Sequence, residues 1–149
     1  YNRMAYEKLA LPLFQKCMDE SRSVGILFID ADHLKYINDN FGHDMGNLAI
    51  SSIASVIHRH CPPGTVSMRY GGDEFVCVIP DTDQKQLQEL KQQITDALSV
   101  LSENNPSFPI EASIGFVIAG APELSLNDYI NLADEKMYAS KKARRATRK

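Results

Sequence analysis

Apolar residues along the chain follow two kinds of spacing, and each kind predicts a different element. Residues 24–29 form an unbroken apolar run that ends at Asp30, which is typical of a strand buried on both faces with a polar residue at its end. Between residues 46 and 60, apolar side chains recur at i, i+4, i+7 and i+8, the pattern of an amphipathic helix. The Pro-Pro-Gly sequence that follows ends this helix.

The same two patterns predict the remaining elements. They are a leading helix over 4–20 that Pro12 kinks or divides, short strands over 65–70 and 75–79, a helix over 83–103, a strand over 110–119, and a closing helix with a capping box formed by Ser125 and Asp128. The Gly-Gly-Asp-Glu sequence between the short strands predicts a hairpin turn in which the glycines adopt unusual backbone angles.

The order of these elements predicts the fold class. Strand, helix, strand, strand, helix, strand is the order of an α+β fold with a ferredoxin-like βαββαβ core, an antiparallel sheet and flanking helices. In this arrangement the end of the first strand lies beside the turn of the central hairpin. We therefore expect Asp30 and Asp73 to converge.

Size and charge narrow the functional class. Residues 1–149, of which 44% are hydrophobic, fit one domain with a proper core. A formal net charge of -3 disfavours general nucleic-acid binding, so we expect no nucleic-acid partner. No apolar run approaches about 18 residues and no signal-peptide pattern is present, so we expect a soluble domain without membrane contact. Three cysteines fit neither a zinc site nor a redox pair, which favours free thiols in the cytoplasm.

The carboxylates at the end of the first strand and in the hairpin turn indicate a metal site. Asp30 and Asp73, with Glu74 adjacent and Asp32 nearby, offer the hard oxygen donors that suit Mg²⁺. Without a cation, converging carboxylates would repel each other at neutral pH. Each motif alone also fits a plainer interpretation, in which Asp30 ends a strand and the acidic pair makes a turn polar.

The sequence Gly71-Gly72-Asp73-Glu74-Phe75, preceded by Arg69-Tyr70, resembles the signature hairpin of the GGDEF family of diguanylate cyclases. The resemblance spans the chain in the expected order. It also covers Tyr1-Asn2-Arg3, Phe28, Asp30, Asp32, His33, Lys35, Asn38-Asp39, Gly42-His43, Gly46, the strand Ala112-Ser113-Ile114-Gly115, Ala133-Asp134, Tyr138, Lys141 and Arg145. The resemblance implies a nucleotide-cyclase-like fold.

The resemblance also implies a role for each matching residue. Mg²⁺, or Mn²⁺ in its place, would be bound by the side chains of Asp30 and Asp73 and by the carbonyl of Ala31. Asp73 and Glu74 would be catalytic, and Glu74 would assist in metal binding or bind a second ion. The substrate-binding residues would be the loop His33, Leu34 and Lys35 through its backbone N–H groups, Gly71 and Gly72 by close backbone approach, Lys141 and Arg145 at the triphosphate, and Asn38 and Asn47 at the guanine edge. Lys141 and Arg145 lie at i and i+4 on the predicted last helix, although a solvated basic tail is the alternative interpretation.

The implied reaction joins two GTP molecules into cyclic di-GMP and releases pyrophosphate. Each domain would present one GTP, so a homodimer is needed for turnover, and we expect an N-terminal sensory or dimerisation module in a longer signalling protein of the cytoplasm, or in the cytoplasmic part of a membrane-anchored protein. Two alternatives stay open: a catalytically weak or inactive GTP-binding regulatory domain, and a nucleotidyl-transfer enzyme with a palm-like site of two carboxylates.

The sequence departs from the family pattern at four positions. Asn47 stands where the family usually has an aspartate that accepts hydrogen bonds from guanine, which weakens the expected selectivity for GTP. Pro62 and Thr65 replace the Arg and Asp of the usual product-binding motif, so product inhibition is not expected. Arg144 replaces a common glycine between the two cationic positions.

Overall fold

The computed structural model describes residues 2–105, 107–120 and 124–147 of the chain. The elements are α1 (Arg3–Ala5), the π-helical turn η1 (Tyr6–Ala10), α2 (Leu11–Asp19), β1 (Val24–Ala31), α3 (Leu34–Phe41), α4 (His43–His60), β2 (Val66–Arg69), β3 (Glu74–Pro80), α5 (Gln84–Glu103), β4 (Ala112–Ala119) and α6 (Leu126–Thr147).

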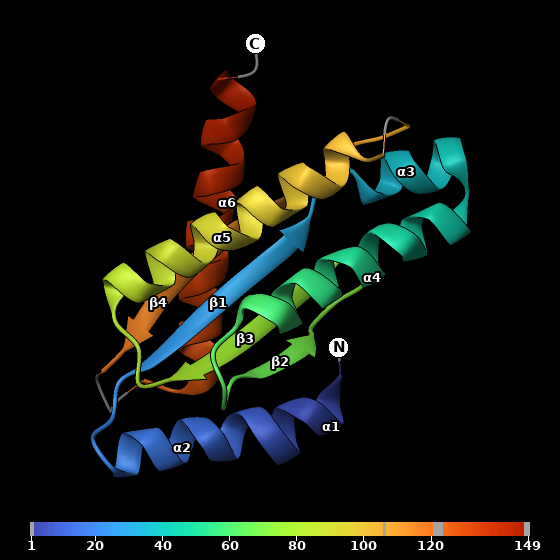
Figure 1. Cartoon of the computed structure of the whole chain (residues 1–149). Coiled ribbons are helices and arrows are strands. Elements are labelled where there is room, and N and C mark those ends of the chain that lie inside the picture. Colours follow the sequence, from blue (N-terminus) through green and yellow to red (C-terminus); the bar gives the residue numbers. More distant parts are fainter. Residues whose placement is uncertain (1, 106, 121–123, 148–149) are drawn as a thin grey trace.

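The sheet has the predicted topology. Its four strands lie in the order β2-β3-β1-β4, and each pair of neighbours is antiparallel. Helices α4 and α5 form the two crossover connections and cover one face of the sheet, while α2 and α6 cover the other (Figure 1). The predicted α+β class with a ferredoxin-like core is therefore confirmed.

Strand β1 is buried on both faces, and its side chains alternate between two cores. Leu27 and Ile29 join the cluster beneath α4 and α5, whereas Ile26 and Phe28 join the cluster beneath α2 and α6. Because successive side chains of a strand point to opposite faces, Asp30 falls on the α6 face. The alternation thus directs this carboxylate toward the last helix.

One helical segment follows the prediction and two differ from it. The leading helix is divided as expected: the π turn η1 ends directly before α2, and Pro12 lies in the first turn of α2, where its missing N–H does no harm. The segment expected as a loop at residues 33–35 is instead the start of α3, and α4 begins at His43 rather than at residue 46. Buried Ile37 ties α3 to the core, and Phe41 packs on Phe108 with a ring-centroid distance of 5.0 Å.

Candidate functional site

The end of β1 lies against the signature turn. In the antiparallel pairing of β1 with β3, Asp30 stands opposite Glu74. The Ala31 N–H donates to the Asp73 carbonyl at 2.7 Å, which extends the contact one residue beyond the strand pairing. The structure thus brings Asp30, Ala31 and Asp73 together, although 43 positions separate Asp30 from Asp73 in the sequence.

One oxygen of Asp30 is paired with a cation and the other is not. Lys141 Nζ on α6 lies 2.6 Å from Asp30 Oδ2, and the two side chains are 17% and 13% exposed. Asp30 Oδ1 is buried and accepts no hydrogen bond from any residue in the described part of the chain. Burial raises the pKa of the Asp30 carboxyl, Lys141 opposes this rise, and the nearby Asp73 carboxylate adds to it.

These residues fit a divalent cation. Among the described residues there is no cluster of three or more His, Cys, Asp or Glu side chains that could hold a metal. The site instead offers the carboxylates of Asp30 and Asp73 and the adjacent Ala31 carbonyl, all hard oxygen donors. Mg²⁺ is commonly held by one or two carboxylates, with water and substrate phosphates as its remaining ligands. The unpaired Asp30 oxygen is the donor atom that such an ion would satisfy.

Glu74 folds back over the first signature glycine. A Cβ atom on Gly71 would lie 2.2 Å from Glu74 Oε1, so the glycine leaves the space that the carboxylate occupies in this conformation. Neither Gly71 nor Gly72 has a φ in the left-handed region, and the prediction of unusual backbone angles is therefore wrong at this turn. Burial, followed by the charges of Asp30, Asp73 and Asp134, raises the pKa of Glu74, while Lys141 opposes the rise.

A cavity of about 280 Å³ opens beside the same turn. Its lining joins α3, α4 and the signature hairpin, and consists of Leu34, Asn38, Gly46, Asn47, Ile50, Arg69, Gly72 and Asp73. A Cβ atom on Gly46 would lie 1.8 Å from Asn38 Oδ1, so this glycine leaves the space that the Asn38 side chain occupies. The structure thus gathers both asparagines and part of the turn around one hollow.

The predicted phosphate-binding segment is the N-terminus of a helix. His33, at φ 61°, directs the chain into α3, and the first backbone bond of the helix runs from the Ile37 N–H to the His33 carbonyl at 2.9 Å. The N–H groups of Leu34 and Lys35 precede that bond, as the first N–H groups of any helix do. Such groups attract anions. The Lys35 side chain is exposed and pairs with Asp39 at 3.1 Å.

The two cationic positions of α6 differ in surroundings. Lys141 reaches the carboxylates at the end of β1, whereas Arg145 is exposed one helical turn later. The structure brings Lys141 into contact with the site carboxylates and leaves Arg145 exposed on the same helix.

Two sets of contacts near the site were not predicted from the sequence, although the residues that make them were named there. Arg69 lines the cavity and donates through Nε to the Gly72 carbonyl at 3.2 Å; its place directly before the signature was the available signal. Buried Asp32 accepts hydrogen bonds from Ser113 Oγ, at 2.9 Å, and from Arg144 Nη2. No pattern in the sequence links residues so far apart.

The residues in place of the usual product-binding motif lie elsewhere. Residues 62–65 form the turn between α4 and β2, where Thr65 Oγ1 donates to the Pro62 carbonyl at 2.7 Å. Strand β2 separates this turn from the signature hairpin. The substitutions therefore do not alter the carboxylate site itself.

Comparison with known proteins identifies the family. The family model described as "Diguanylate cyclase, GGDEF domain" matches residues 1–147. The chain belongs to this family. It is 30% identical over 146 residues to the probable diguanylate cyclase DgcC of Escherichia coli, covering 97% of this chain and 39% of that protein. It is also 32% identical over 142 residues to the cyclic di-GMP phosphodiesterase PdeB of Shewanella oneidensis, covering 94% of this chain and 16% of that protein.

Solved structures of GGDEF domains share the fold. The GGDEF domain of DgcB from Caulobacter crescentus, in complex with c-di-GMP, superposes with a TM-score of 0.83 at 27% identity, over 95% of this chain and 85% of that one. The chain spans about two fifths of the length of DgcC, the first of these relatives. Within residues 2–105, 107–120 and 124–147, no helix combines the length and apolar character needed to cross a bilayer.

Proposed function

We propose that this domain is an active diguanylate cyclase that condenses two GTP molecules into cyclic di-GMP with release of pyrophosphate. The observation that carries the proposal is the buried, unpaired Oδ1 of Asp30 beside the signature turn. A carboxylate oxygen in that state is stabilised by a hydrogen-bond donor or a cation, and the second carboxylate of Asp73 beside it favours the cation. Mg²⁺, or Mn²⁺ in its place, would be held by Asp30, Asp73 and the Ala31 carbonyl and would stabilise negative charge on the phosphate oxygens during transfer.

The remaining residues would bind and orient the nucleotide. Asn38 and Asn47 line the cavity in which a guanine edge would be recognised. The phosphates would meet the N–H groups at the start of α3, where His33, Leu34 and Lys35 lie, and the charges of Lys141 and Arg145. Gly71 and Gly72 would let the turn approach the nucleotide closely.

Glu74 is the proposed proton acceptor for the attacking ribose 3′-hydroxyl. Burial and the neighbouring carboxylates raise the pKa of Glu74, which makes this side chain a better base than a fully solvated glutamate. In each of two rounds the 3′-oxygen forms a bond to the α-phosphorus of the other nucleotide and the bond to pyrophosphate breaks. The proton of the hydroxyl passes to the carboxylate and from there to water.

Turnover would require two copies of the domain, each presenting one GTP. The structural relative DgcB has been crystallised as a coiled coil joined to its GGDEF domain, at 26% identity and a TM-score of 0.83. We propose that a comparable N-terminal dimerisation or sensory segment of a longer protein brings two copies of this chain together. Three free cysteines, Cys17, Cys61 and Cys77, suit the reducing cytoplasm as the place of action.

The second candidate function is a GTP-binding regulatory domain of little or no activity. Two observations favour it: the neutral Asn47 in the cavity, and the relative PdeB, which is named as a phosphodiesterase. The complete signature from Gly71 to Phe75, with Asp30 opposite Glu74, weighs against it.

Product analysis of a forcibly dimerised protein separates the two functions. The chain fused to a parallel coiled coil is incubated with GTP and Mg²⁺, and products are identified by mass spectrometry. We expect cyclic di-GMP and pyrophosphate from the parent, and a loss of rate on the order of 10²-fold or more in Asp73→Ala. Asp96→Ala, an exposed position on α5, is the matched control and should keep the parent rate. GTP binding without any product would favour the regulatory domain.

A further inference from the structure

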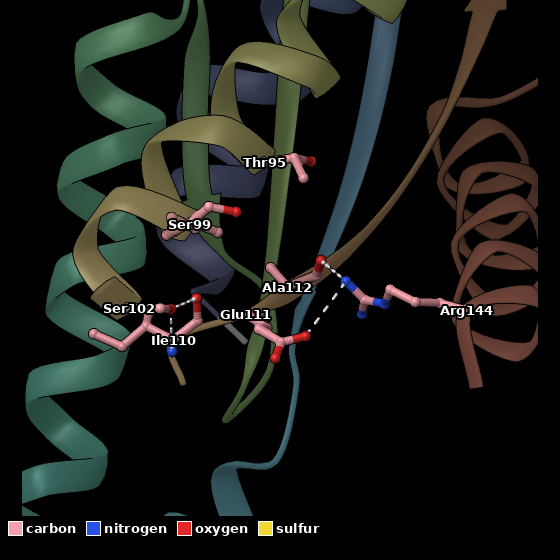
Figure 2. A pocket seen from close by; sticks show the side chains of 8 residues that line it. Thr95, Ser99, Ser102, Ile110, Glu111, Ala112 and Arg144 are labelled. Atoms are coloured by element: carbon pink, nitrogen blue, oxygen red, sulfur yellow. Dashed lines mark hydrogen bonds and ion pairs between the residues drawn. The ribbon is translucent and has the colours of Figure 1, made fainter. Parts of the chain in front are cut away.

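Arg144 reaches from α6 to the end of β4 instead of into solvent. Its Nη1 donates to the Ala112 carbonyl at 3.1 Å and lies 3.9 Å from Glu111 Oε2 (Figure 2). Its Nη2 donates to Ser113 Oγ at 2.6 Å and to the carboxylate of Asp32. The guanidinium thus links the last helix to both strands that end near the site.

Asp32 is the more deeply buried of the two carboxylates that face α6. Its side chain is 5% exposed, and Ser113 Oγ lies 2.9 Å from Oδ1 and 3.2 Å from Oδ2. Lys141 Nζ lies 3.5 Å from Asp32 Oδ1 but 2.6 Å from Asp30 Oδ2. Two buried carboxylates therefore share two cations, with Lys141 closer to Asp30 and Arg144 bound to Asp32.

A buried carboxylate without a counter-charge is strongly destabilising. Within the described ranges, Lys141 and Arg144 are the cations that form ion pairs with Asp32. If Arg144 were absent, Lys141 would have to neutralise Asp32 alone and would be drawn away from Asp30 and from any phosphate. The arginine at this position therefore determines whether the lysine is free to serve the substrate.

We propose that Arg144 is a positioning residue that neutralises Asp32 and so frees Lys141 for the nucleotide phosphates. The proposal rests on the proposed GTP-dependent function. Lys141 neutralises Asp30 through their ion pair. When a divalent cation takes over that carboxylate, the ammonium group can turn to the phosphates without leaving Asp32 unpaired, because Arg144 stays in place.

The test uses charge removal at both ends of the Arg144–Asp32 contact. Affinity for a non-hydrolysable GTP analogue in the presence of Mg²⁺ is measured by calorimetry, and thermal unfolding is measured without ligand. Arg144→Gln should weaken binding about tenfold, and Arg144→Lys should weaken it less, because a lysine keeps the charge. Lys142→Gln, which removes the same charge from an exposed position on α6, is the matched control and should change affinity less than twofold.

Two double variants distinguish charge compensation from simple anchoring of the helix. Asp32→Asn combined with Arg144→Gln should regain most of the lost affinity and of the lost melting temperature, since the carboxylate that needs a partner is gone. In a Lys141→Gln background, Arg144→Gln should cost no further affinity, since no lysine remains to be diverted.

Each result supports or overturns the proposal. It is overturned if Asp32→Asn fails to rescue Arg144→Gln, if Arg144→Gln weakens binding equally with and without Lys141, or if Lys142→Gln has the same effect. A parent protein that binds no GTP analogue would refute the proposed function instead. The ligand-free melting temperatures would then decide alone whether Arg144 compensates the charge of Asp32.

Discussion

Asp30 owes its position to the two-residue repeat of β1. The strand is apolar on both faces, so the sequence alone did not reveal which face the carboxylate would join. The alternation of Ile26 and Phe28 toward α6 places it beside Lys141. The ion pair with Lys141 offsets the cost of burying the Asp30 carboxylate, and the second carboxylate oxygen, Oδ1, remains available to a cation.

Asn47 supplies the first prediction at the residue scale. A carboxylate at this position would accept from two N–H donors of guanine in a charge-assisted contact, which is roughly twice as strong as a neutral one. The amide offers one acceptor and one donor, and a polar contact left unmade costs about 1 to 3 kcal/mol. Asn47→Asp should therefore bind GTP about tenfold more tightly and raise the preference for GTP over ATP.

Competition calorimetry with GTP and ATP measures both effects. Asn40→Asp, an added negative charge on exposed α3 outside the cavity lining, controls for long-range repulsion of the phosphates. Equal GTP affinity and equal selectivity in Asn47→Asp and the parent would mean that position 47 does not touch the base.

Glu74 supplies the second prediction, because its raised pKa affects stability as well as chemistry. A carboxyl whose folded-state pKa exceeds its unfolded value destabilises the fold when it is ionised, so the cost is absent below the unfolded pKa and present above the folded pKa. Glu74→Gln should therefore melt at a higher temperature than the parent at pH 7. The difference should vanish on acidification through the carboxyl range, and cyclase activity should fall on the order of 10²-fold.

Thermal unfolding of the ligand-free proteins across pH tests this sign. Glu89→Gln, at an exposed position on α5, is the control and should show no comparable stabilisation. A Glu74→Gln protein that is less stable than the parent at neutral pH would contradict the electrostatic account of the turn.

At the scale of elements, the helices and strands with a clear apolar periodicity were predicted from the sequence, whereas a short helix and the long-range contacts were not. Helices α4 and α5 and the core strands follow from their stripes and runs. Helix α3 was not predicted, although Leu34, Ile37 and Phe41 have helical spacing, because the segment is short and its first residues resemble a phosphate-binding loop. The Asp32–Arg144 contact joins positions 112 apart, and only the packing of α6 against the sheet brings them together.

The packing of α6 on β4 gives the third prediction. A Cβ atom on Gly115 would lie 2.0 Å from the Met137 backbone nitrogen and 2.5 Å from the Ala133 carbonyl oxygen, and backbone atoms of a helix cannot yield separately. Gly115→Ala must therefore push α6 away from the sheet, at a cost of about 1 to 3 kcal/mol. The melting temperature should fall by roughly 3 to 10 °C, and GTP binding should weaken because Lys141 moves with the helix.

Gly120→Ala is the matched control, since no residue in the described part of the chain lies within 4 Å of the Cβ atom it would add. It should leave both melting temperature and affinity near the parent values. If the two alanine variants melted within a degree of each other, α6 would be more loosely packed than the structure indicates.

At the scale of the whole molecule, the residues of the site lie together at one end of the sheet. The exit of β1, the β2–β3 turn, the start of α3 and the last part of α6 meet there, while the described chain contributes one cavity beside one signature turn. The topology was predictable because the order of elements allows few antiparallel sheets. Under the proposed function, this site would hold one nucleotide, and another copy of the domain would present the second.

The last prediction concerns the dependence of rate on association. If each domain presents one GTP, the unfused chain at saturating GTP and low protein concentration should make cyclic di-GMP at a rate proportional to the square of its concentration. Fusion to a parallel coiled coil raises the effective concentration of the second domain to the order of millimolar, so the rate should become linear in protein and far higher per chain at micromolar concentration. Mixed coiled-coil dimers that pair a parent chain with Asp73→Ala measure whether both sites are needed. A linear dependence for the unfused chain, with the same rate per chain as the fusion, would mean that one copy of the domain completes the reaction unaided.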